Sequence, residues 1–154
     1  MLASTSPKRN GFVLDTNVLS LFAKIDRLDL LLQLTTVPLY LTSMIQSELE
    51  TGLENGVTYL ANVLQLIHTG KLQVIPLNEI DRQFMRALPN KLADGEAEAI
   101  ALCRRTGLTL ITHDRKALNY CIQEGINSIR FTTLVNQLKN TGLLTEIEIQ
   151  AIFS

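Results

Sequence analysis

Gly11-Phe12-Val13-Leu14-Asp15-Thr16-Asn17 is the stretch of sequence that decides the fold. Its first four residues are small or apolar without interruption, which predicts a strand over residues 11–15 that is covered on both faces. Residues 16–25 then follow a helical pattern. Asp15 is therefore expected at the carboxyl end of a buried strand, where open α/β sheets bind ligands. We interpret it as part of a functional acidic site.

The alternation of strands and helices continues along the whole chain. It favours a three-layer α/β/α sandwich around a central, mainly parallel sheet of four to five strands. A single domain is expected over residues 1–154, with a core at 10–131 and C-terminal helices at 132–154. Further strands are predicted at 38–42, 72–77, 108–112 and 126–131, and helices at 28–34, 44–51, 57–68, 79–88, 95–105, 115–123 and twice in the C-terminal segment.

Small polar residues and glycines predict where these helices begin and end. Ser43 is expected to cap the helix at 44–51, with Gln46 completing a capping box. Gly52 is expected to end that helix. Asn78 and Asp94 are predicted as N-caps of later helices.

Composition narrows the class of protein. Hydrophobic residues make up 46% of the chain and charged residues 19%, which predicts a folded core. The net charge of −1 argues against coating of duplex DNA but allows a site for one or two phosphates. Cys103 and Cys121 form no CxxC pair, so a reducing cytoplasm is the expected location. No run is suited to a signal peptide or a membrane span, so a soluble protein is expected.

Four acids are candidates for a shared site. Asp15 and Asp114 follow predicted strands, and Glu48 and Glu96 lie on predicted helices. For either strand-end acid alone, a helix cap has odds of roughly one half. Glu96 also suits the dipole at a helix N-terminus, and Glu48 could be a solvated residue, as could Glu50 and Glu98.

As a set, these acids suggest metal chemistry. Clustered carboxylates repel one another unless a cation neutralises them. Hard oxygen ligands without a His or Cys cluster suit Mg²⁺ or Mn²⁺, which activate water and stabilise charge on a phosphodiester during hydrolysis. Arg115 and Lys116 are either solvated or placed to contact a substrate phosphate. For His68 and His113 we favour structural or solvent roles, although His113 adjoins the proposed site.

Four motifs resemble the signatures of PIN-domain nucleases, and they occur in the order that this family uses. The resemblance covers about residues 11–131, and the segments 131–138 and 142–145 also resemble the end of one prokaryotic branch. The motifs are Leu14-Asp15-Thr16-Asn17-Val18-Leu19, Thr42-Ser43 followed by Glu48, Gly95-Glu96-Ala97-Glu98-Ala99-Ile100-Ala101-Leu102, and Leu110-Ile111-Thr112-His113-Asp114-Arg115.

The resemblance implies cleavage of single-stranded RNA with one or two Mg²⁺ or Mn²⁺ ions. The metal ligands would then be Asp15, Glu48, Glu96 and Asp114, directly or through water. Asn17 and Thr112 would order these ligands. The third position of the family is more often Asp, and here Glu96 and Glu98 both qualify, with Glu96 favoured and Glu98 as a helper.

Many proteins of this VapC-like kind are toxins with a cognate antitoxin, and many are dimers, so both partners are expected here. Two other hypotheses compete. A PIN fold could serve as a binding or scaffold module without nuclease activity. A receiver-like phosphoacceptor domain with Asp15 as acceptor is a third, but it would need an Asp where the third strand ends in Ile75-Pro76-Leu77.

Overall fold

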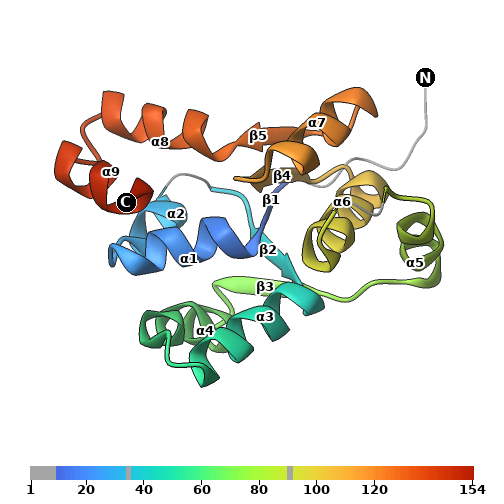
Figure 1. The fold of residues 1–154 in the computed structure, drawn as a ribbon, viewed down its shortest axis with the longest axis horizontal. Coiled ribbons are helices and arrows are strands. Elements are labelled where there is room, and N and C mark those ends of the chain that lie inside the picture. Colours follow the sequence, from blue (N-terminus) through green and yellow to red (C-terminus); the bar gives the residue numbers. More distant parts are fainter. Residues whose placement is uncertain (1–9, 34–35, 90–91) are drawn as a thin grey trace.

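A five-stranded, fully parallel sheet forms the centre of the protein (Figure 1). The computed structural model describes residues 10–33, 36–89 and 92–154. The strands run in the order β3-β2-β1-β4-β5, and Phe12 pairs with both Leu39 and Thr109. Both edges of the central strand β1 are paired, and its residues Val13 and Leu14 are fully buried, as its apolar sequence predicts. The strands are β1 (Phe12–Leu14), β2 (Leu39–Thr42), β3 (Leu72–Ile75), β4 (Thr109–Thr112) and β5 (Ser128–Arg130).

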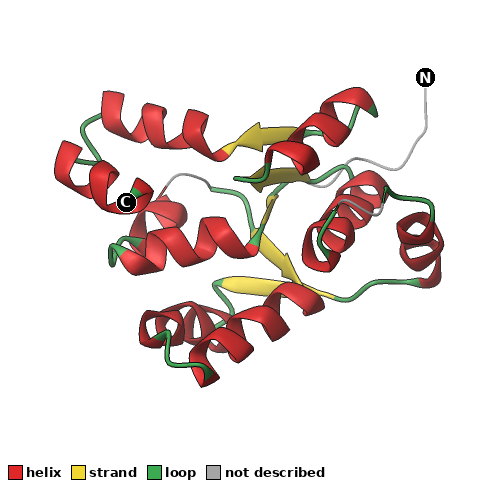
Figure 2. Cartoon of the chain, viewed as in Figure 1, coloured by secondary structure: helices red, strands yellow, loops and turns green. Residues whose placement is uncertain are grey.

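Helices cover both faces of the sheet (Figures 1 and 2). The predicted three-layer α/β/α fold is therefore confirmed. One layer holds α1 (Thr16–Lys24), α2 (Leu28–Gln33), α3 (Ser43–Glu54), the 3₁₀ turn η1 (Thr58–Leu60), α4 (Ala61–His68), α8 (Phe131–Asn140) and α9 (Glu146–Phe153). The other holds α5 (Glu79–Arg86), α6 (Asp94–Thr106) and α7 (Arg115–Gln123). Leu34, the predicted end of the second helix, and the first nine residues lie outside the described part of the chain.

The predicted boundaries of α3 are wrong at both ends. Thr42, not Ser43, is the N-cap, and its side chain accepts a hydrogen bond from the Ile45 amide at 3.3 Å. Ser43 is the first helical residue, so the predicted capping box with Gln46 does not form. The helix also continues through Gly52, where an added Cβ would lie 2.6 Å from Leu60 Cδ1. Gly52 is there because η1 packs closely on α3, and not to end the helix.

Two other caps have different outcomes. Asn78 caps α5 as predicted, and it forms a capping box with Asp81, whose amide donates to Asn78 Oδ1 at 2.9 Å. Asp94 was predicted to cap α6, but it lies in the first turn and Ala93 occupies the N-cap position without a side-chain hydrogen bond. An unfilled cap leaves amide donors of that first turn available to other groups.

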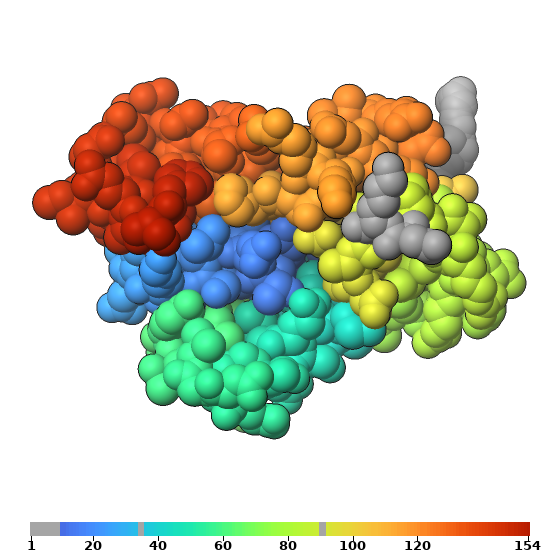
Figure 3. All heavy atoms as spheres, viewed as in Figure 1, coloured from blue at the N-terminus to red at the C-terminus, as the bar shows by residue number. Residues whose placement is uncertain are grey.

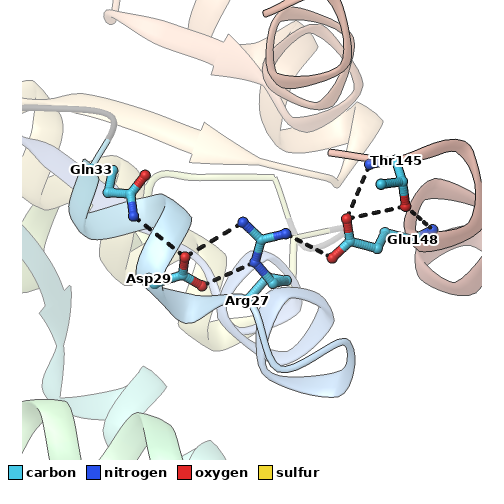
Figure 4. Close-up of polar contacts among 5 residues, drawn as sticks. All are labelled: Arg27, Asp29, Gln33, Thr145 and Glu148. Atoms are coloured by element: carbon cyan, nitrogen blue, oxygen red, sulfur yellow. Dashed lines mark hydrogen bonds and ion pairs between the residues drawn. The ribbon is translucent and has the colours of Figure 1, made fainter. Parts of the chain in front are cut away.

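The C-terminal helices are tied to the α1–α2 corner by an ion-pair network (Figure 4). Arg27 Nη1 lies 2.8 Å from Glu148 Oε2, and Arg27 Nε lies 3.2 Å from Asp29 Oδ1. Glu148 also accepts a hydrogen bond from the Thr145 amide at 3.0 Å, which closes a capping box at the start of α9. The network fixes α9 beside α1. No helix of the described chain is both long and apolar enough to cross a membrane.

Candidate active site at the carboxyl edge of the sheet

Two acids lie at the point where the connections of the sheet diverge. From β1 the chain proceeds to β2 on one side, and from β4 it proceeds to β5 on the other. In a parallel sheet this divergence opens a crevice beyond the carboxyl ends of the two strands. Asp15 directly follows β1, and Asp114 lies two residues after the end of β4. The topology thus brings together residues that are almost 100 positions apart.

Asp15 is buried, and both of its carboxylate oxygens are held. Only 2% of the residue is exposed. Oδ1 accepts a hydrogen bond from the Val18 amide at 2.8 Å and so caps α1. Oδ2 accepts from Thr112 Oγ1 at 2.6 Å and from the His113 amide at 3.2 Å. Burial raises the pKa of Asp15, and these hydrogen bonds oppose that shift. Asp15 is therefore a helix cap and also a fixed part of the crevice.

Thr112 links the two strand-end acids. Its hydroxyl donates to Asp15 and accepts a hydrogen bond from the Asp114 amide at 3.0 Å. Asp114 in turn caps α7, with Oδ1 accepting from the Ala117 amide at 2.8 Å. One buried hydroxyl therefore holds the carboxylate of Asp15 and the backbone of Asp114.

Glu96 and Glu98 have different surroundings, although both lie on α6. Glu96 is half-buried, and its pKa is raised to about 7, first by burial and then by the charges of Asp114 and Asp15. Glu98 is 6% exposed, and its Oε1 accepts a hydrogen bond from the Met44 amide at 2.8 Å. Glu96 thus faces the strand-end acids, whereas Glu98 holds the first turn of α3.

Glu48 reaches the same region from α3. Burial of its carboxylate raises its pKa, a hydrogen bond with Thr16 lowers it, and the charges of Asp15, Asp94 and Glu98 raise it further. The carboxylate lies against Gly95, where an added Cβ would overlap Glu48 Oε1. The two helices therefore hold each other: Glu98 of α6 binds the start of α3, and Glu48 of α3 lies at the start of α6.

Asp15, Glu48 and Glu96 border one cavity of about 190 Å³. On the molecular surface, the α1, α3 and α6 segments meet on one face (Figure 3). The predicted residue Asn17 lines the cavity. Glu98 and Thr112 are not among its lining residues, and Asp114 adjoins it through Glu96. The lining residues are Asp15, Thr16, Asn17, Glu48, Ala93, Gly95 and Glu96.

The ligand atoms of this cavity are of the type that a hard divalent cation prefers, but their spacing does not enclose an ion. Carboxylate oxygens are the ligands that Mg²⁺ and Mn²⁺ prefer. After burial, the charges of Asp114 and Asp15 raise the pKa of Glu96, and a cation would relieve this repulsion. Within the described residues, however, no three His, Cys, Asp or Glu side chains stand close enough together to hold one ion as they lie.

Two contacts of the site were not predicted from the sequence. The His113 amide holds Asp15, while its ring packs on Phe131 with centroids 5.1 Å apart. Gly95 accommodates the Glu48 carboxylate, a contact between α6 and α3 that the local sequence does not indicate. Of the predicted phosphate contacts, Arg115 and Lys116 are both exposed in the first turn of α7.

A family model described as DUF3368: PIN domain matches residues 11–152. The chain belongs to the PIN domain family. The resemblance seen in the four motifs is thereby confirmed. No curated protein matched the sequence.

Solved PIN-like structures share the fold at low sequence identity. VapBC2 from Rickettsia felis, bound to a promoter DNA fragment, aligns with TM-score 0.57 and 14% identity over 78% of this chain and 98% of that one. VapBC-1 from nontypeable Haemophilus influenzae aligns with TM-score 0.57 and 16% identity, over 79% of this chain and 98% of that one. PAE2754 from Pyrobaculum aerophilum aligns with TM-score 0.55 and 18% identity, over 86% of this chain and 98% of that one. At these identities the likeness concerns the PIN fold alone.

Proposed function

We propose that this PIN-domain protein is a divalent-metal-dependent endoribonuclease that hydrolyses single-stranded RNA. The observation that carries the proposal is the acidic cavity, in which Asp15, Glu48 and Glu96 converge from three elements and Asp114 adjoins. Burial in this cavity, and then the charges of Asp114 and Asp15, raise the pKa of Glu96 to about 7. Strongly shifted groups in a cleft are characteristic of functional sites.

Mg²⁺ or Mn²⁺, as one or two ions, would be held by Asp15, Glu48, Glu96 and Asp114, directly or through water. When bound, such an ion activates water and stabilises charge on a phosphodiester. Thr112 keeps Asp15 and Asp114 in place through its hydroxyl, and Asn17 stands at the cavity wall to order the ligands. Glu98 acts as a helper by holding the start of α3, which carries Glu48.

The partners proposed are an RNA strand, a cognate antitoxin and a second copy of the chain, in the cytoplasm. Arg115 and Lys116 are exposed beside Asp114 and would contact substrate phosphates. The toxin role is supported by the VapBC assemblies among the structures with this fold. A PIN-fold binding module without catalysis is the second candidate, and the open spacing of the acids favours it.

The first test compares two neighbouring acids of α3 in an RNA cleavage assay. Wild-type protein should cleave single-stranded RNA with Mn²⁺ or Mg²⁺ and not with a chelator. Glu48→Gln removes a cavity carboxylate, and we expect cleavage to fall about 10- to 100-fold, the range seen when groups that support a metal are lost. The matched control is Glu50→Gln, a change at an exposed acid on the same helix. Its cleavage rate should stay within about twofold of the wild-type rate. Absence of both metal binding and cleavage in the wild type would favour the binding module.

A second prediction concerns the glycine beside Glu48. Gly95→Ala should displace the Glu48 carboxylate, because the new methyl group would overlap Oε1. Alanine also favours the helix by up to about 1 kcal/mol, so α6 should still form. We expect cleavage to fall about tenfold or more while the melting temperature holds, since a misplaced group of this kind costs up to about 100-fold. Full activity in Gly95→Ala would show that the position of Glu48 does not matter.

A further inference from the structure

A second cavity, of about 240 Å³, lies between α7 and the segment that leads into α6. Helices α6 and α7 pack side by side at one end of the molecule (Figure 1). Sites for drug-sized ligands usually measure about 300 to 1,000 Å³, so this cavity suits a smaller, single-ring or double-ring group. It is lined by Pro89, Leu92, Lys116, Asn119, Tyr120 and Gln123.

Four of the lining residues form one stripe on α7. Lys116, Asn119, Tyr120 and Gln123 follow the i, i+3, i+4, i+7 spacing that places side chains on one face of a helix. A neighbouring face of α7 is packed into the core through Ala117 and Cys121. The stripe borders the core at the partly buried Tyr120. Because it carries a cation, two amides and a phenol ring, it is equipped for binding.

The chemistry of the lining matches a nucleobase attached to a phosphate. Tyr120 offers a flat ring on which a base can stack, and Pro89 and Leu92 form the apolar wall opposite α7. Asn119 and Gln123 carry amides, which hydrogen-bond the edges of unpaired bases. Lys116, at the start of the helix, supplies a cation for a phosphate.

This cavity is adjacent to the acidic cavity along the chain at two places. Leu92 lines the cavity beside α7, and the next residue, Ala93, lines the acidic cavity. Lys116 lies two residues after Asp114, whose carboxylate caps the same helix. Consecutive residues are about 3.8 Å apart. The two cavities therefore have consecutive residues in their linings, a separation that neighbouring nucleotides of one strand can span.

We propose that the cavity formed by Pro89, Leu92 and the outer face of α7 binds one unpaired nucleobase of an RNA strand whose neighbouring phosphodiester lies at the acidic cavity. The proposal rests on the proposed function and gives it a positional preference: the base beside the scissile bond is held on Tyr120. It assigns Asn119 and Gln123 to reading that base and Lys116 to its phosphate.

The test measures binding of a labelled, short single-stranded RNA to the full-length protein by fluorescence anisotropy, at one salt concentration. The assay is run in chelator and again in Ca²⁺, with products checked on a gel. A series of the same RNA carries one abasic ribose at each position in turn. For the wild type, one abasic position should weaken binding about 5- to 100-fold, the range for loss of one stacked base. Tyr120→Leu should weaken binding of the intact RNA by the same factor and should no longer distinguish that abasic position.

The controls separate this inference from folding and from the proposed function. Tyr120→Phe keeps the ring and should bind like the wild type. Asn119→Ala removes only an exposed amide, and it should change which base is preferred at that position. Lys71→Ala, at an exposed lysine that is not among the lining residues, should match the wild type. Two outcomes overturn the nucleobase site alone. In one, the wild type binds and cleaves RNA but no abasic position weakens its binding. In the other, the same abasic position still weakens binding to Tyr120→Leu. A wild type that binds no RNA overturns both proposals.

Discussion

Asp15→Asn should reduce metal-dependent RNA cleavage by about 1,000-fold or more, because a bound ion would lose a charged ligand worth several kcal/mol in the transition state. The fold should survive. Asparagine keeps the shape of the side chain, but its single oxygen cannot serve both the Val18 amide and the Thr112–His113 pair. One N–H group is left unpaired, at a cost of about 1 kcal/mol.

Relief of the buried charge offsets part of this cost, because burial raises the pKa of Asp15 and so disfavours its ionised form. The melting temperature, followed by circular dichroism, should therefore shift by only a few degrees. The matched control is Asp29→Asn, an acid paired with Arg27 at the far corner of the molecule (Figure 4), which should cleave RNA normally. Undiminished cleavage by Asp15→Asn would remove this carboxylate from the mechanism.

Glu96→Gln should have two opposite effects. Cleavage should fall about 100-fold or more, because a bound ion would lose a charged ligand and stabilise the transition state less well. The metal-free protein should become more stable at pH 8, because the ionised Glu96 carboxylate is desolvated and repelled by Asp114 and Asp15. We expect a gain of about 1 to 2 kcal/mol, below the limit of about 3 kcal/mol for the full pKa difference, since the side chain is partly in water.

The pH dependence of this gain follows from the direction of the shift. The pKa of Glu96 is raised from 4.5 to about 7, so its favourable contribution to folding is complete below pH 4.5 and is lost as the pH rises through 7. The stability difference between Glu96→Gln and wild type should be near zero at pH 4.5 and full at pH 8, as measured by urea unfolding. Mn²⁺ should raise the melting temperature of the wild type more than that of the variant. A variant less stable than the wild type at pH 8 would contradict the crowding of charges inferred here, and Glu54→Gln serves as the exposed control.

The central strand and its acid could be predicted because their signals are local. An uninterrupted apolar run followed by Asp15 has one simple interpretation in an α/β protein, and the structure places β1 at the middle of the sheet. The alternation of elements similarly determined the layer architecture. Asp15 and Asp114 met because parallel strands share a carboxyl edge, a rule that needs no knowledge of side-chain packing.

Features that depend on packing between elements could not be predicted in the same way. Ser43 has better cap chemistry than Thr42 by composition, but the strand ends at Thr42 and the chain turns there. Gly52 has the usual sequence signal of a helix end, and only the approach of Leu60 explains it. On α6, Glu96 and Glu98 have similar apolar neighbours, and the contact of Glu98 with Met44 decides which of them is left to face the crevice.

The pairing of β1 with β4 also bears on how the protein is made in a cell. The carboxylate of Asp15 is held by Thr112 and His113, which follow it by 97 and 98 positions. Ribosomes add about 5 to 20 residues per second, so about 5 to 20 seconds pass between synthesis of Asp15 and of these partners. During that interval the nascent chain has neither the central strand pair nor a complete acidic crevice. Any activity that depends on this crevice would therefore be absent until most of the polypeptide has been translated.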